Sequence, residues 1–399
     1  MSEAAAPASA LQVWASDPQL TRGRRHAEPP APTRNDFQRD RDRIVHSTAF
    51  RRLVYKTQVF LNHEGDLFRT RLTHSIEVAQ LARAIARTMR LNEDLCEAIS
   101  LAHDLGHTPF GHAGQDALDD RLRAVDQDSA GFEHNFQSLR VVDVLEERYP
   151  LFDGLYLSFE TREGVLKHCS RRRALQLDAD EPGGVGRRFL ERSQPSLEAQ
   201  VCNLADEIAY NTHDIDDGVR SGLLVYEQLL ELPLFMRFHA LALQGAPTLT
   251  GRRLLYETLR RMLSALVYDV VDASTRLIEA QRPTSADAAR AGPALIAFSA
   301  GMGSELRQVN AFLRRELYRH EQVVRTTEGA KRVVRDLFDA YLAQPGQLPA
   351  EHAQRLPLLQ TVADYIAGMT DRFALKEHLR LTGVAIDLNE ARGDDAARP

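Results

Sequence analysis

Apolar side chains recur at helical spacing through most of this chain, and that pattern limits the fold more than any other feature. In IEVAQLARAIARTMR (76–90) they return about every 3.6 residues and so gather on one face of a helix. The only segment typical of a strand is VYKTQVFLN (54–62). The sequence therefore predicts an all-α fold. Similar patterns predict further helices over residues 92–106, 134–150, 195–218, 252–281, 311–346 and 358–381.

The domain organisation follows from where this periodicity begins and ends. Residues 1–35 are rich in Ala, Pro, Arg and Ser without a sustained period, which predicts an irregular, mobile N-terminal arm. Residues 36–385 are expected to form a single large helical domain, because a chain of this length can bury one large core. Residues 386–399 predict a tail. The polar, glycine-containing segment 170–195 predicts an exposed loop.

Composition and charge argue against several classes of protein. Hydrophobic residues make up 43% and charged residues 27% of the chain, as in an ordinary globular protein. The formal net charge of -6 argues against a dedicated nucleic-acid-binding protein. No apolar run reaches the ~18 residues that span a bilayer, and the first residues are not typical of a secretory signal. Three cysteines without a CxxC spacing predict reduced thiols in the cytoplasm: Cys96, Cys169 and Cys202.

A metal-binding pattern begins in the stretch AHDLGHTPFGHAGQ (102–115), which has three histidines, one aspartate and three glycines. The pair His103 and Asp104 ends one predicted helix, His74 precedes another, and Asp206 lies on a third. Two imidazoles and two carboxylates suit a divalent ion such as Mn, Mg, Fe, Co or Ni better than a structural zinc. A hydrogen-bond network without metal is the alternative.

Two further histidines, His107 and His112, follow the same pair in a glycine-rich turn. Gly106, Gly111 and Gly114 let the backbone turn sharply and approach a ligand closely. We expect the two histidines to act beside the metal as acid, base or phosphate contacts. A purely structural role in the turn is the alternative.

Basic side chains lie just upstream of the first predicted ligand. Cations beside a metal indicate a polyanionic substrate such as a phosphate ester, whereas a solvated helix face is the plainer interpretation. The residues concerned are Arg51, Arg52, Lys56, Arg69 and Arg71.

Six ordered blocks of the sequence carry a resemblance to a known family. The chain resembles the bacterial deoxyguanosine-triphosphate triphosphohydrolase-like proteins, which belong to the HD-domain superfamily of metal-dependent phosphohydrolases. The resemblance covers residues 36–385 and implies an HD-type helical fold, with an HD core at about 66–218 and a C-terminal helical part at about 219–385. The blocks are FQRDRDRIVHSTAFRRLVYKTQVF, EGDLFRTRLTHSIEVAQLARAIAR, LAHDLGHTPFGHAG, EHNFQSLRVV, LADEIAYNTHDIDDG and DYIAGMTDRFALK.

The resemblance implies an activity and a set of partners. It implies hydrolysis of a deoxynucleoside triphosphate such as dGTP between the 5′ oxygen and the α-phosphate, which releases a deoxynucleoside and tripolyphosphate. It also implies a cytoplasmic homo-oligomer, because relatives often form hexamers. Some of these relatives are activated by a nucleotide that binds between subunits. No membrane association is implied.

The resemblance also implies roles for individual residues. The metal ligands would be His74, His103, Asp104 and Asp206. The histidines beside the α-phosphate would be His107, His112 and His134, and His112 would transfer the proton. The substrate would be held by Arg71, Arg52, Tyr210 and Asp214, the last two on its sugar.

One position departs from the family pattern and keeps alternatives open. Relatives carry a carboxylate three residues after His112, where this chain has Gln115. Either the activity is low, or another acid such as Asp116 or Glu133 substitutes, or His112 is not the key proton donor. The alternatives are another HD phosphohydrolase, acting as a phosphomonoesterase or phosphodiesterase, and a low-turnover protein that senses nucleotides or weakly binds single-stranded nucleic acid.

Overall fold

The computed structural model describes residues 11–26, 28–58, 68–353 and 357–388 of the chain. Over these ranges it forms nineteen α-helices, and its only β-pairing consists of two isolated bridges. The predicted all-α fold is confirmed. None of the described helices is long and apolar enough to cross a membrane.

The helices follow one another with short connections. A π-helical turn, Val141–Leu145, continues the sixth helix. In chain order the α-helices are α1 (Asp36–Val45), α2 (Thr48–Arg52), α3 (Arg71–Met89), α4 (Glu93–Ala102), α5 (His112–Val125), α6 (His134–Arg140), α7 (Phe159–Val165), α8 (Arg171–Asp180), α9 (Arg187–Glu191), α10 (Leu197–Arg220), α11 (Tyr226–Leu229), α12 (Pro233–Gly245), α13 (Gly251–Gln281), α14 (Ala286–Ala291), α15 (Ala300–Glu316), α16 (Glu321–Ala343), α17 (Ala350–Ala353), α18 (Leu358–Ala367) and α19 (Asp371–Thr382).

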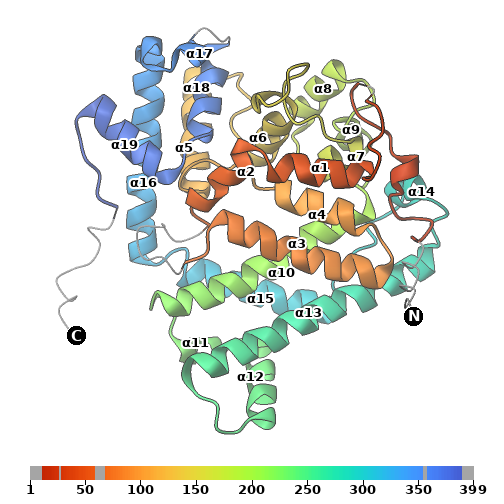
Figure 1. Ribbon diagram of the computed structural model, residues 1–399. Coiled ribbons are helices and arrows are strands. Elements are labelled where there is room, and N and C mark those ends of the chain that lie inside the picture. The colour runs from red at the N-terminus through yellow and green to blue at the C-terminus, as the bar shows by residue number, and fades with distance from the viewer. Residues whose placement is uncertain (1–10, 27, 59–67, 354–356, 389–399) are drawn as a thin grey trace, which may run out of the picture.

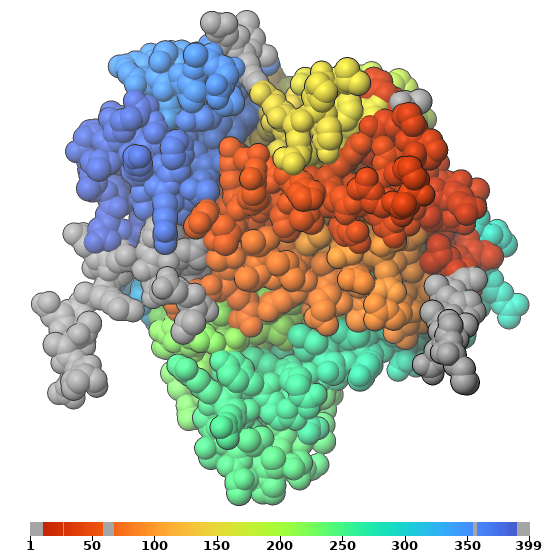
Figure 2. All heavy atoms as spheres, in the orientation of Figure 1, coloured from red at the N-terminus to blue at the C-terminus, as the bar shows by residue number. Residues whose placement is uncertain are grey.

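Four helices surround the largest hydrophobic core. α3 packs against α4 and α10, and α10 packs against α13 (Figure 1). Ile85, Leu95, Val201 and Leu266, one from each helix, are fully buried there. Full burial of one such side chain stabilises the fold by about 1.5–3 kcal/mol. α12 packs along α13, and Figure 2 shows this green segment projecting from one end of the molecule.

A second core lies on the C-terminal side of the molecule, blue in Figures 1 and 2. There α16 packs against α5, α18 and α19, and it buries Val333 and Phe338 against Val362. Phe110, in the connection between α4 and α5, also belongs to this core. Residues 103–111 therefore join the central helices to the C-terminal ones, and they carry His103 and His107.

Local capping fixes where the helices of the site begin. Asn92 Oδ1 accepts a hydrogen bond from Leu95 N at 3.0 Å at the start of α4, and Glu93 in the first turn complements the helix dipole. Ser196 Oγ likewise accepts from Ala199 N at 3.2 Å at the start of α10. These caps set the starts of α4, which His103 and Asp104 follow directly, and of α10, which carries Asp206.

Two helices predicted as continuous are each interrupted. The segment 311–346 contains the end of α15 and all of α16, because the His320 side chain accepts from a backbone N–H of α16 and starts a new helix. The segment 358–381 divides into α18 and α19 beyond Gly368, where Thr370 caps the second helix. Each break is short enough for the apolar pattern to conceal it.

The prediction of an exposed loop over residues 170–195 is wrong, because α8 and α9 lie within that segment. Ser170 Oγ accepts from Arg173 N at 3.3 Å and begins α8, and Ala174 is fully buried. The segment has few apolar residues, so its helices leave almost no periodic signal in the sequence.

The short strand predicted over residues 54–62 does not form in its described part. Leu53–Tyr55 is a 3-10 helix, and Thr57 makes one isolated bridge with Thr70. Residues 59–62 lie outside the described residues, as does most of the predicted tail, 386–399.

The described part of the expected N-terminal arm lies against the helical domain instead of standing free of it. The backbone N and Oγ of Ser16 donate to the Glu198 carboxylate at 2.9 and 2.8 Å. Arg24 forms an ion pair with the buried Asp40 at 2.6 Å. These contacts join residues far apart in the sequence, and the composition of the arm does not reveal them.

Candidate metal centre

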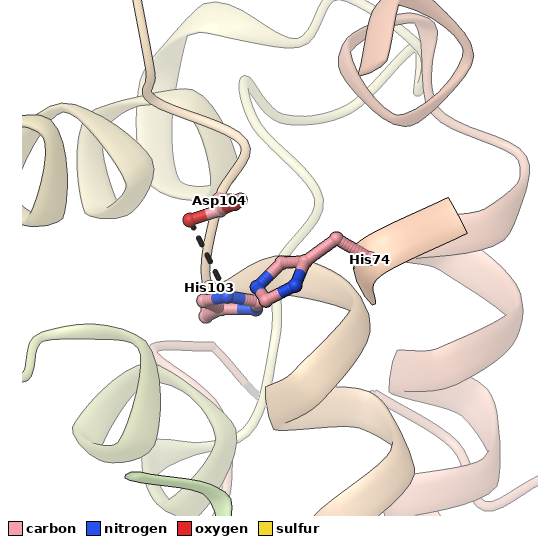
Figure 3. A group of neighbouring side chains, drawn as sticks. All are labelled: His74, His103 and Asp104. Carbon is pink, nitrogen blue, oxygen red and sulfur yellow. Dashed lines mark ion pairs between the residues drawn. The ribbon is translucent and has the colours of Figure 1, made fainter. Parts of the chain in front are cut away.

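His74, His103 and Asp104 meet between α3 and the end of α4 (Figure 3). All three are buried, and each offers one ligand atom within 4.8 Å of the other two. His74 lies in the first turn of α3, and the other two follow the last turn of α4. Donor atoms of this type and spacing suit a single divalent cation.

The hydrogen bonds of His103 leave one of its nitrogens free for a cation. Nδ1 lies 2.6 Å from Ser100 O, and a carbonyl can only accept, so Nδ1 carries the proton. In the neutral ring, which is the form that binds a metal ion, Nε2 then carries a lone pair, and it is buried without a hydrogen-bond partner among the described residues. It lies 3.3 Å from Asp104 Oδ1 and 3.6 Å from Asp206 Oδ1. A lone pair beside two carboxylates is an arrangement that a bound cation satisfies.

Asp206, from α10, completes this arrangement of donors. Its Oδ1 lies 2.9 Å from His74 Nε2, and its Oδ2 accepts from Lys167 Nζ at 2.5 Å. The structure thus places Asp206 beside two of the other predicted ligands, His74 and His103. Lys167 follows α7, and no motif in the sequence indicates its position in the site.

The electrostatics of the site favour anionic carboxylates. Burial alone would raise the pKa of Asp104, but the neighbouring histidines and Arg71 hold the pKa of that carboxyl well below its usual range. Burial is likewise outweighed at Asp206, where nearby cationic groups keep the pKa low. Burial lowers the pKa of His103, and the two carboxylates outweigh it and raise that pKa. A concentrated negative charge of this kind attracts a metal ion.

Three more histidines form a cluster beside the metal group. The His107 ring stacks on the His134 ring with centroids 3.9 Å apart, and the His112 ring lies 5.4 Å from the first and 5.8 Å from the second. Burial lowers the pKa of His134 to about 3 and the pKa of His107 well below its usual value. Desolvation and Arg71 also lower the pKa of His112, which is nevertheless exposed at the start of α5.

Gly106 explains how α6 comes close enough to bring His134 into this cluster. A Cβ atom at Gly106 would lie 2.1 Å from Ser138 N and 2.4 Å from His134 O. Only glycine permits this approach. Gly111 has a positive φ of 59°, and its absent Cβ leaves room for the Arg71 guanidinium.

Gln115 hydrogen-bonds to His134 in the structure. Its Oε1 accepts from His134 N at 3.0 Å and lies 2.7 Å from His134 Nδ1. Nδ1 is therefore the protonated nitrogen of that ring, and Nε2 is left as an acceptor. The substitution of glutamine for a carboxylate acts on His134, and the concern about His112 drawn from the sequence loses its geometric basis.

Arg71 is the basic residue that the structure brings to the metal group. It is 1% exposed, and its Nη1 donates to Asp104 Oδ2 at 2.8 Å. Its Nε and Nη2 are buried without hydrogen-bond partners among the described residues. A buried guanidinium with free donors is suited to binding an anion.

The other basic residues lie further from the metal group. Arg52 is exposed on α2, and its Nη1 lies beside Gly368. Arg69 forms ion pairs with Asp216 at 2.8 Å and Asp217 at 2.9 Å. Arg51 is exposed as well. The basic cluster seen in the sequence therefore separates into one buried anion contact, Arg71, a buried Lys56 that bonds backbone carbonyls, and three surface or ion-paired arginines.

Tyr210 and Asp214 lie on α10 beyond Asp206. A third residue, Tyr318, packs against both of them, and the sequence did not indicate it. The Tyr318 hydroxyl donates to Asp214, and its ring lies 6.1 Å from the ring of Tyr210. Burial raises the pKa of Asp214 to about 8. Tyr318 follows α15, whose approach to α10 no local pattern predicts.

A buried polar group holds the turn that carries the histidines. Lys56 Nζ donates to the carbonyls of His107 and Ala367, and burial lowers the pKa of Lys56 to about 7. Asp371 accepts from Thr57 N and from Phe110 N, each at 2.9 Å. The turn between α4 and α5 is thereby fastened to the junction of α18 and α19.

Two family models match the chain. The HD domain matches residues 71–211, and the phosphohydrolase-associated domain matches residues 296–380. The helical fold and the His/Asp cluster are thus those of a metal-dependent HD-domain phosphohydrolase.

Curated relatives define the family more closely. Deoxyguanosinetriphosphate triphosphohydrolase-like proteins of Bordetella pertussis and Ralstonia pickettii are each 58% identical, over 93% and 94% of this chain and 96% and 95% of their own length. The protein of that name from Nitrosomonas europaea is 53% identical over 94% of this chain and 99% of its own. The chain belongs to the deoxyguanosinetriphosphate triphosphohydrolase-like family.

Proposed function

We propose that this protein hydrolyses deoxynucleoside triphosphates such as dGTP and releases the deoxynucleoside and tripolyphosphate. The metal ligands in this proposal are His74, His103, Asp104 and Asp206. A divalent ion held there, such as Mn, Mg, Fe, Co or Ni, would polarise a phosphoryl oxygen and lower the pKa of water.

The observation that carries the proposal is a cation site joined to an anion site. His103 Nε2 is a buried lone pair beside two carboxylates, and Arg71 bonds one of those carboxylates while its Nε and Nη2 have no hydrogen-bond partner in the described chain. A phosphate ester that binds a metal ion needs both features within one pocket. The guanidinium would neutralise a phosphate oxygen and orient the phosphorus for attack.

The histidines have separate tasks in this proposal. His112 is exposed and can meet the substrate, so it is assigned to protonate the leaving 5′ oxygen. His134 presents Nε2 as an acceptor because Gln115 holds its Nδ1–H. His107, stacked on His134 and 3.2 Å from Asp104 Oδ1, holds that carboxylate in place.

The sugar is assigned to the group around Asp214. A carboxyl whose pKa is raised to about 8 is neutral at pH 7 and can both donate to and accept from a 3′ hydroxyl. Tyr210 would pack against the face of the sugar. A ribose 2′ hydroxyl would meet this packed surface. Arg52 would contact the terminal phosphates from the surface.

A cytoplasmic homo-oligomer, a hexamer among the possible assemblies, remains a prediction, as do an activating nucleotide between subunits and weak binding of single-stranded nucleic acid.

The decisive experiment identifies the products. The Mn²⁺-loaded protein is incubated with each of the four dNTPs, singly and mixed, and the phosphates are resolved by ion chromatography. Tripolyphosphate, absent in His103→Ala, is the expected product, and activity in mixtures alone would indicate activation by a nucleotide. Pyrophosphate or orthophosphate would instead assign the protein to another HD phosphohydrolase reaction, and no product with nucleotide still bound would indicate a sensor.

A further inference from the structure

His213 lies directly behind the candidate ligand His74. The two side chains face each other through their Nδ1 atoms, which are 3.4 Å apart, and the rings meet edge to face with centroids 5.5 Å apart. His213 is 6% exposed and comes from α10, about two turns beyond Asp206 on the same helix. Its other nitrogen, Nε2, lies 2.5 Å from Glu77 Oε2.

The carboxylate at Glu77 determines which nitrogens carry protons. A carboxylate only accepts hydrogen bonds, so His213 Nε2 carries a proton. In the neutral ring, His213 Nδ1 is then an acceptor, and it accepts from His74 Nδ1–H. That leaves His74 Nε2 as a lone pair, directed at Asp206 Oδ1 at 2.9 Å. Two acceptors that face each other at this distance need a cation between them.

The position of Glu77 is itself fixed by charge. Arg69 Nε donates to Glu77 Oε2 at 3.3 Å, and Arg69 Nη1 is anchored by Asp216 and Asp217. Glu77 is one turn beyond His74 on α3, so these two residues keep a fixed position relative to each other. We call the hydrogen-bonded series Glu77–His213–His74 the relay. It connects α3 with α10, and these two helices supply the proposed ligands His74 and Asp206.

We propose that Glu77 and His213 are positioning residues that set the tautomer of His74, so that its Nε2 faces the metal site as a lone pair. Outer groups of this kind orient ligating histidines and commonly contribute 10–100-fold, in order of magnitude, to metal affinity. The inference rests on the proposed metal site: His213 contacts the proposed ligand His74, and neither Glu77 nor His213 is itself a proposed ligand.

The test compares two substitutions at one position by titrating the chelator-treated full-length protein with Mn²⁺ and following free Mn²⁺ by EPR. His213→Leu fills the space but accepts no hydrogen bond, so Mn²⁺ affinity should fall about 10–100-fold. His213→Asn fills it less well, but its amide oxygen can take the place of Nδ1, so affinity should stay within about threefold of the wild type.

Three further proteins complete the design. The Glu77 side chain is partly exposed, so the Glu77→Gln variant should fold normally. The glutamine amide can donate as well as accept, so it no longer fixes the proton on His213 Nε2, and Mn²⁺ affinity should fall about tenfold. His378→Leu is the matched control, because His378 is also buried and bonds Asp336 at 2.9 Å, far along the chain from the site. Its Mn²⁺ affinity should be unchanged. His74→Ala reports whether the proposed site binds the ion at all.

The outcomes separate the two proposals. Loss in His213→Leu with retention in His213→Asn supports the relay. Equal loss in both, or unchanged affinity in His213→Leu and Glu77→Gln while His74→Ala abolishes binding, overturns the relay and leaves the metal site intact. Binding that is insensitive to His74→Ala overturns the metal site and the relay together.

Discussion

Histidine occupies three different environments within one site, and burial and hydrogen bonds decide each. His103 donates to a carbonyl and presents a bare Nε2 to two carboxylates. His134 is stacked, desolvated and tied to Gln115, and its pKa falls to about 3. His112 is exposed. The same side chain is therefore suited to hold a cation, to present an acceptor or to carry a proton.

Replacing His112 by asparagine should remove proton transfer and little else. We expect kcat to fall about 10²–10⁴-fold, which is the usual contribution of a general acid. Because the side chain is exposed, the melting temperature and the Mn²⁺ content should stay at wild-type values. The measurement is the steady-state rate of tripolyphosphate release, and a rate within about threefold of the wild type would assign the proton to another group.

Asp214 should make stability depend on pH. Burial raises its folded pKa to about 8, whereas an unfolded carboxyl ionises near pH 4, at about its ordinary pKa. Between these values the unfolded chain releases a proton that the folded chain keeps, so this group lowers the free energy of unfolding as pH rises from about 4 to 8. Asp214→Asn should therefore gain at least about 1 kcal/mol relative to the wild type between pH 5 and pH 8.

Urea unfolding of both proteins at the two pH values measures this difference. If the free energy of unfolding changes equally with pH in the wild type and in Asp214→Asn, Asp214 is ionised in the folded state at pH 7.

At the scale of elements, the turn between α4 and α5 is held from outside its own helices. Phe110 adopts a positive φ of 61°, which an L-residue keeps only when its surroundings enforce it. Asp371, at the start of α19, accepts from Phe110 N, and Lys56 donates to the carbonyl of His107. The C-terminal helices thus fix the backbone that carries the candidate catalytic histidines.

Asp371→Asn should weaken this fastening. Asparagine has one acceptor oxygen, so either Thr57 N or Phe110 N loses its partner, at a cost of about 1–3 kcal/mol in the free energy of unfolding. We also expect kcat to fall about tenfold because the turn moves. Urea unfolding and product release measure the two effects. Asp336→Asn, which affects His378 instead, should cost stability without a change in kcat.

At the scale of the whole molecule, the HD segment (residues 71–211) and the phosphohydrolase-associated segment (residues 296–380) share their hydrophobic cores. Leu306 and Phe312 of α15 lie in the same core as α3 and α10, and Tyr318 reaches Asp214 from beyond α15. The second core joins α5, from the HD segment, to α16 and α18. Burial of apolar area across both segments makes their folding cooperative.

A chain that ends at residue 295 should therefore fail to form a stable domain. It would expose the apolar faces of α5, α10 and α13 that the C-terminal helices cover. Circular dichroism and limited proteolysis should show reduced helix and rapid cleavage. A truncated chain that melts cooperatively and resists protease would show that the HD segment is independent of the remainder.

The sequence by itself determined the all-α class, several of the longer helices and the types of residue in the site. Apolar periodicity is local, so α3, α4, α10 and α13 follow from it, whereas the short breaks before α16 and α19 and the polar helices α8 and α9 do not. The four candidate ligands carry a recognisable order, His74 first and Asp206 last, because metal chemistry restricts them to a few side chains.

Only the tertiary structure decided which partners complete those residues. Tyr318 is 104 residues from Asp214, and Asp371 is 314 from Thr57. Asp371 lies within the block DYIAGMTDRFALK, but nothing in that block indicates what it binds. Likewise Gln115 bonds His134, and His213 meets His74. Such contacts depend on how whole helices pack against one another, and packing leaves no periodic trace in the neighbouring sequence.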